Sequence, residues 1–174
     1  MLKHQAFGLS DVGSKREHNE DFMLQVPSLG LYLVCDGMGG EAAGEIASRM
    51  GAEYIATHIE GQFSLVQEFL DTPSIEKRQD VQNLIENAIQ GACKQVYQTG
   101  QKDQQKRGMG STVVMALVCG NNAFVAHVGD SRAYIYRQNE AHQITEDHSL
   151  VNEYVKAGIL TREKAQNHPQ ANMI

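Results

Sequence analysis

Acidic side chains stand at the ends of apolar segments, and they are the residues of this sequence best placed to do chemistry. Asp36 and Asp130 each close an apolar run beside a glycine, and Glu20 and Asp21 open another segment. Carboxylates that meet at one sheet edge repel each other and resist ionising together. A hard divalent cation relieves that repulsion, and oxygen ligands favour magnesium or manganese. The pattern indicates a divalent-cation site, although each acid except Asp36, taken alone, is more typical of a solvated turn.

Asp36 is the strongest of these candidates, because it directly follows the densest apolar run, LGLYLVC. The glycines after it allow backbone carbonyls to approach a ligand closely. Arg16 lies four residues before Glu20, which is typical of an ordinary surface ion pair. If a metal neutralises the carboxylates, the guanidinium is free to hold a phosphate through two parallel hydrogen bonds.

The same glycine-rich segment, residues 37–42, also fits the G-x-G-x-x-A pattern of a dinucleotide-binding loop. Two features count against that interpretation. The second strand that should follow is missing, since the pattern stays helical to about Ile59. Asp36 would also place negative charge against the pyrophosphate. A dinucleotide-binding protein is therefore kept only as a remote alternative.

The elements that must position these residues come in separate runs. The hydrophobic periodicity predicts strands, then two long helices, then strands again. The expected strands are 7–12, 22–26, 29–35, 110–119, 123–129 and 132–137, the expected helices are 41–59, 76–97 and 150–157, and 98–107 is expected to be a loop. Segregated strands and helices favour an α+β fold, with antiparallel sheets covered by helices.

Composition narrows the class of protein. The chain has 174 residues and a formal net charge of -6, which favours one domain and argues against a nucleic-acid binder. No apolar run is long enough to span a membrane, and the first residues lack the apolar region of a secretory signal. Cys35, Cys93 and Cys119 are expected to be small buried side chains in a reducing compartment. We therefore expect a cytoplasmic protein with no nucleic-acid or membrane partner.

Six motifs, in order and at compatible spacing, resemble the protein phosphatase 2C family, the metal-dependent serine/threonine phosphatases, in its bacterial form. They are DVGSKREHNED (11–21), LVCDGMGGEAAGEIAS (33–48), GMGSTVV (108–114), AHVGDSRAYIYR (126–137), ITEDHSLVNEYVKAGILT (144–161) and HPQANMI (168–174). The resemblance implies a four-layer α-β-β-α sandwich, in which two packed antiparallel sheets are covered by helices.

The resemblance also implies a metal site. Asp36 would bridge two Mn²⁺ or Mg²⁺ ions, and the Gly37 carbonyl would coordinate one of them. Glu20 would be a ligand directly or through water. Asp21 would support these ligands without binding the metal itself. Asp130 would match the aspartate of a third metal site.

The implied activity is hydrolysis of phosphoserine and phosphothreonine in proteins by metal-activated water, without a covalent phosphoenzyme. Arg16 would bind the substrate phosphate and act with Asp36 in catalysis. Residues 145–174 would form a flap beside the active site. The implied partner is a phosphoprotein, and the implied setting is bacterial signalling opposed to a serine/threonine kinase.

One departure from the family is large. Its Ser-Asp-Gly and Asp-Asn motifs, whose aspartates complete the metal site, do not occur in this sequence. We therefore expect residues 1–174 to be a single, incomplete domain that lacks the C-terminal strands. Alone, the chain is expected to be inactive, and marginally stable or oligomeric. The alternative is a non-catalytic binding or regulatory module with the same fold.

Overall fold

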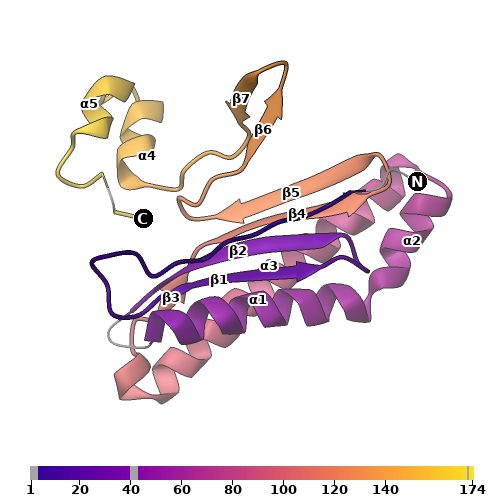
Figure 1. The fold of residues 1–174 in the computed structure, drawn as a ribbon, viewed down its shortest axis with the longest axis horizontal. Coiled ribbons are helices and arrows are strands. Elements are labelled where there is room, and N and C mark those ends of the chain that lie inside the picture. The colour runs from indigo at the N-terminus through magenta and orange to yellow at the C-terminus, as the bar shows by residue number, and fades with distance from the viewer. Residues whose placement is uncertain (1–3, 40–42, 172) are drawn as a thin grey trace. The chain divides into compact units, whose positions relative to one another are not determined.

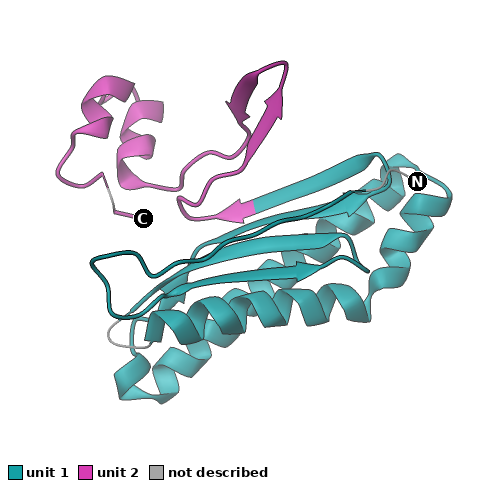
Figure 2. Cartoon of the chain, in the orientation of Figure 1, with its two compact units in different colours: residues 1–126 teal, residues 127–174 magenta. Residues whose placement is uncertain are grey.

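A computed structural model describes residues 4–39, 43–171 and 173–174 of the chain. The chain divides into two compact units, residues 1–126 and residues 127–174 (Figure 2). The prediction of a single, incomplete domain stays a prediction.

The first unit is built on an antiparallel sheet. Its strands follow the order β1-β2-β4-β5, and a short strand, β3, pairs with the end of β2. The turn between β1 and β2 closes at Gly30, whose φ of 67° is the left-handed conformation that glycine adopts readily. The bounds are β1 (Asp21–Val26), β2 (Leu31–Met38), β3 (Gly110–Ser111), β4 (Val113–Cys119) and β5 (Asn122–Val128).

Two long helices, α1 (Ala43–Gly61) and α3 (Ile75–Lys102), pack against each other, and α1 packs along β1 and β2 (Figure 1). A shorter helix, α2 (Phe63–Asp71), packs on α3. Alternate residues of β2 are buried, as expected of a strand with one face on a core. The core side chains between sheet and helices include Leu31, Leu33, Ile55, Ile59, Val81, Leu84, Ala88, Met115 and Leu117.

The second unit contains a hairpin and two short helices. Strands β6 and β7 pair antiparallel across a turn in which Gln138 and Asn139 have positive φ. The side chains of Ser149 and Thr161 cap the helices by accepting from backbone amides in the first turn. The bounds are β6 (Tyr134–Arg137), β7 (Glu140–Gln143), α4 (Leu150–Lys156) and α5 (Arg162–Gln166).

The predicted α+β class with antiparallel sheets is confirmed, and so are both long helices. The antiparallel pairing of β2 with β1 and β4 contradicts the dinucleotide alternative, because that fold needs a parallel βαβ unit around the loop. Residues 40–42 of the proposed loop, and the predicted start of the first helix there, lie outside the described residues.

The predicted strand 7–12 is wrong. These residues pair with no strand, and the side chains of Phe7 and Leu9 are 90% and 91% exposed. The local sequence instead forms a turn, in which the Asp11 carboxylate accepts from the Gly13 amide at 2.7 Å.

The predicted loop 98–107 is wrong over its first half. α3 continues to Lys102, because polar residues such as Gln98 and Gln101 form solvated helix well. A single 3₁₀ turn, Gln104–Lys106, follows.

Cys93 is exposed, contrary to prediction, because it lies beside the buried stripe of α3 that contains Ala88, Ala92 and Val96. Cys35 and Cys119 are buried as predicted, and burial raises their thiol pKa values to about 12 and about 11. None of the helices among the described residues combines the length and the apolar character that crossing a membrane requires.

Candidate metal and phosphate site

The register of β1 and β2 places two acidic residues directly opposite each other. Asp21 pairs with Asp36, and both side chains are exposed. Opposite residues of an antiparallel pair project from the same face of the sheet, where two like charges are unfavourable. A cation at this point would offset that repulsion.

Glu20 stands next to this pair and is held by its backbone. Its carbonyl oxygen accepts from the Gly37 amide at 3.1 Å and from the Ser48 hydroxyl at 2.7 Å. The carboxylate is mostly buried, with 17% of the side chain exposed. Its Oε1 is a buried oxygen that has no hydrogen-bond partner among the described residues.

Two glycines make room for this carboxylate. A Cβ on Gly44 would collide with Glu20 Oε1 and lie 2.8 Å from Glu20 Cδ, and a Cβ on Gly37 would lie 2.7 Å from the Glu20 carbonyl oxygen. A side chain at Gly44 would displace the Glu20 carboxylate, and one at Gly37 would collide with the backbone carbonyl of Gly44 as well as with that of Glu20. Gly37 and Gly44 therefore allow close packing between β2 and α1.

The backbone of Asp36 is fixed from the other side by residues 111 and 112. The Asp36 amide donates to Thr112 Oγ1 at 3.0 Å, and the Asp36 carbonyl accepts from the Thr112 amide at 2.8 Å. Ser111 Oγ lies 3.2 Å from the Asp36 carbonyl oxygen and 2.8 Å from that of Thr112. Neither Ser111 nor Thr112 was expected at the site from the sequence, although the GMGSTVV motif (108–114) was the signal that could have found them.

Arg16 lies at the solvent side of the site, in the turn that precedes β1. Its Nη1 is 3.3 Å from Glu20 Oε2, and 65% of its side chain is exposed. Nearby, Asn19 braces the turn, because its side chain accepts from the Asp21 amide at 3.0 Å and donates to Ser10 Oγ at 2.7 Å. The guanidinium therefore stands beside the acidic cluster with most of its surface in solvent.

The structure thus brings five of the six predicted site residues together in the first unit: Arg16, Glu20, Asp21, Asp36 and Gly37. Asp130 is half-buried and belongs to the second unit. The backbone next to it is fixed by His148, whose amide donates to the Gly129 carbonyl at 3.0 Å.

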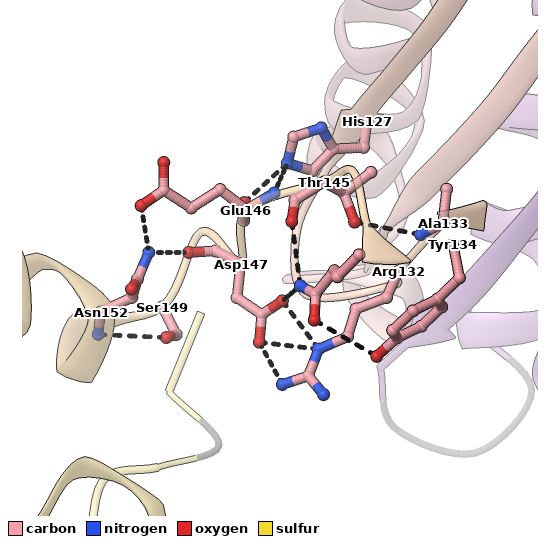
Figure 3. A network of polar contacts seen from close by, with 10 residues as sticks. His127, Arg132, Ala133, Tyr134, Thr145, Glu146, Asp147, Ser149 and Asn152 are labelled. Carbon is pink, nitrogen blue, oxygen red and sulfur yellow. Dashed lines mark hydrogen bonds and ion pairs between the residues drawn. The ribbon is translucent and has the colours of Figure 1, made fainter. Parts of the chain in front are cut away.

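Asp147 is the centre of a polar network in the second unit (Figure 3). Arg132 contacts its carboxylate through Nε at 2.9 Å and Nη2 at 2.6 Å, and Gln143 donates to it at 3.3 Å. The Asp147 carbonyl accepts from Asn152 of α4 at 2.8 Å. The hydrogen bonds from Arg132 hold the pKa of the Asp147 carboxyl below its ordinary value. Asp147 therefore contacts β7 through its carboxylate and α4 through its backbone carbonyl.

The donor set in the first unit fits a hard cation. No group of three or more His, Cys, Asp and Glu residues among the described parts of the chain is arranged to hold a metal ion. Magnesium, however, commonly keeps several waters and uses only one or two carboxylates plus substrate phosphate. Exposed Asp36, and Glu20 Oε1, which has no partner in the described ranges, supply oxygens of that kind.

Comparison with known proteins gives one consistent answer. The Protein phosphatase 2C family model matches residues 7–154. The protein phosphatase PhpP of Streptococcus pneumoniae is 38% identical over 169 residues, and the serine/threonine phosphatase stp of Listeria welshimeri is 32% identical over 168 residues. Both alignments cover 95% of this chain, and they cover 64% and 63% of the relatives.

Solved structures agree with the sequence relatives. The Streptococcus agalactiae serine/threonine phosphatase has a TM-score of 0.78 at 38% identity, covering 95% of this chain and 65% of that one. A crystal structure of the catalytic domain of the phosphatase PstP, solved with two manganese ions, has a TM-score of 0.71 at 31% identity, covering 90% and 61%. This chain therefore belongs to the protein phosphatase 2C family.

Proposed function

We propose that this chain carries the metal-binding and phosphate-binding part of a protein serine/threonine phosphatase. The observation that supports it most directly is the acidic cluster at the ends of β1 and β2. Asp21 and Asp36 oppose each other there, and Glu20 holds a buried oxygen without a partner among the described residues. The substrate class follows from relatives that are named serine/threonine phosphatases.

Within the proposed site, each residue has a distinct task. Asp36 and Glu20 bind Mn²⁺ or Mg²⁺ with the Gly37 carbonyl, and Asp21 adds negative charge behind them. Divalent cations at such a site lower the pKa of water and offset the charge of phosphate oxygens. Arg16 exchanges its contact with Glu20 for the substrate phosphate, which it holds with two parallel hydrogen bonds. Asp130 holds a third cation, and residues 145–174 flank the bound phosphoprotein.

The proposal includes the biological setting implied by the family. The substrate is a phosphoprotein produced by a serine/threonine kinase, and the relatives named above come from bacteria. A cytoplasmic location remains a prediction.

The test is hydrolysis of a phosphoserine peptide with manganese or magnesium, in a catalytically active form of the protein. Asp36→Asn should lower kcat by several orders of magnitude, because it removes a carboxylate that would hold the divalent cations needed to lower the pKa of water. Thermal unfolding in a chelator should stay close to that of the unaltered protein, since Asp36 is exposed at a strand end. Near-normal turnover of Asp36→Asn at saturating manganese would contradict the assignment.

A non-catalytic binding module is the second candidate. One observation favours it: the described residues hold no group of three or more His, Cys, Asp and Glu side chains arranged to hold a metal ion. Such a module would bind a phosphopeptide with measurable affinity and release no phosphate in the same assay.

A further inference from the structure

Ser48 is a fully buried hydroxyl on α1, in a stretch whose other buried residues are small or apolar. A buried hydroxyl is costly unless it forms a hydrogen bond. Ser48 Oγ lies 2.7 Å from the backbone oxygen of Glu20 and 3.2 Å from that of Glu45. It therefore has two candidate acceptors, one outside its helix and one within it.

A hydroxyl carries one proton, and the shorter contact assigns it to Glu20. Serine and threonine within a helix ordinarily donate to a carbonyl three or four residues earlier. Thr57 does so on the same helix, with Glu53 at 2.9 Å. Ser48 instead links α1 to the residue just before β1, so its bond is a tertiary contact at the acidic strand end.

The Glu20 carbonyl is consequently held from two directions. Gly37, at the end of β2, donates to it at 3.1 Å, and Ser48 donates to it from α1. Gly44 lies one turn before Ser48 on the same helix face, where it leaves space for the Glu20 carboxylate. α1 thus contacts both the backbone and the side chain of Glu20.

We propose that Ser48 is a positioning residue for the cation site, one that fixes Glu20 so that its buried Oε1 is available to a divalent ion. This inference rests on the proposed function, which makes Glu20 a ligand. Ser48 touches only the Glu20 backbone, so it sets the place of the carboxylate without binding the ion. Losing such outer partners typically weakens metal binding 10- to 100-fold, and about tenfold is expected for one hydroxyl.

The experiment uses the 174-residue chain and three variants. Ser48→Ala removes the hydroxyl, and Ser48→Thr keeps it. Thr57→Ala is the matched control, because it removes a hydroxyl bond on α1 that does not reach Glu20. Hydrogen exchange of the Gly37 amide is measured in a chelator, and Mn²⁺ affinity is measured by electron paramagnetic resonance into the millimolar range.

Ser48→Ala should speed exchange of the Gly37 amide, because the carbonyl that this amide contacts loses its anchor on α1. It should weaken Mn²⁺ binding about tenfold. Ser48→Thr should restore both values, and Thr57→Ala should change neither. Thermal unfolding in the chelator identifies any general loss of stability.

Equal Mn²⁺ affinity of the unaltered chain and Ser48→Ala would overturn this inference and leave the proposed function standing. An equal loss in Thr57→Ala would also overturn it. No Mn²⁺ binding by the unaltered chain would contradict the proposed function, and the inference about a cation site would fall with it. Unchanged Gly37 exchange in Ser48→Ala would show that the link itself does not position Glu20.

Discussion

At the scale of single residues, Arg16 is the cation that faces both the acidic cluster and solvent, 3.3 Å from Glu20 Oε2. In an active form of the protein, Arg16→Ala should raise KM for a phosphoserine peptide about tenfold, because a charge-assisted hydrogen bond contributes about 1.5–3 kcal/mol. Arg16→Lys should recover only part of this, since lysine lacks the two-pronged donor. Steady-state kinetics measure both values.

The control for Arg16 is Lys15→Ala, which removes the same charge from the neighbouring exposed residue of the turn. It should leave KM nearly unchanged. Manganese affinity, measured by calorimetry, should change little in Arg16→Ala. If Arg16→Ala chiefly weakened manganese binding, Arg16 would support the metal ligands and would not contact the substrate.

At the scale of elements, the Asp147 carboxylate accepts from Arg132 and from Gln143 of the hairpin strand β7, while its backbone carbonyl accepts from Asn152 of α4. Its folded pKa lies below the ordinary value, chiefly through the hydrogen bonds from Arg132. The pair therefore stabilises the folded unit above the ordinary pKa of aspartate, and this contribution disappears as pH falls through the lowered folded value. Asp147→Asn should cost about 1 kcal/mol at neutral pH, because half of Arg132 is solvated.

The difference in free energy of unfolding between Asp147→Asn and the unaltered chain should shrink as the pH falls below the ordinary pKa of aspartate. Hydrogen exchange of the amides of the β6–β7 hairpin, which Gln143 belongs to, measures this difference across that pH range. Glu153→Gln is the control, because Glu153 forms an exposed ion pair with Lys156 on α4 itself. A cost that does not depend on pH would argue against the pairing with Arg132.

Elements with a long apolar repeat were predictable, and those set by a tertiary partner were not. α3 repeats Val81, Leu84, Ile85 and Ala88, so its existence follows from sequence, whereas α2 buries only Val66 and Phe69 and gives too short a pattern. Residues 7–12 have some strand character but no strand partner.

The candidate site, too, was predictable from the sequence only in part. The position of Asp36 after an apolar run was visible in the sequence, although β2 continues through it to Met38. Its pairing with Asp21 depends on how the turn at Gly30 sets the register. The Thr112 hydroxyl that accepts from the Asp36 amide lies 76 residues away in the chain. A contact at that separation becomes visible only in the fold.

At the scale of the whole molecule, apolar side chains remain exposed on the strands of the first unit. α1 packs against β1 and β2, and the residues of β2 that alternate with its buried ones include Val34, which is 42% exposed. On β5, an end strand in the sheet order, Val125 is 38% exposed. Apolar end strands favour pairing with another chain. We therefore expect the 174-residue chain to self-associate as its concentration rises.

Turnover by the same chain should be negligible, because its sequence contains neither the Ser-Asp-Gly nor the Asp-Asn motif of the family. Light scattering and phosphoserine peptide hydrolysis in manganese, measured on one sample, test both expectations.

Val125→Lys should lower the molar mass at high concentration, since a charged end strand resists pairing. Ile75→Lys, at a position 89% exposed at the start of α3, should not. If the chain stays monomeric at every concentration, association through the sheet is contradicted. The same holds if Ile75→Lys lowers the molar mass as much as Val125→Lys does. Turnover typical of an intact phosphatase would show that the carboxylates present here suffice.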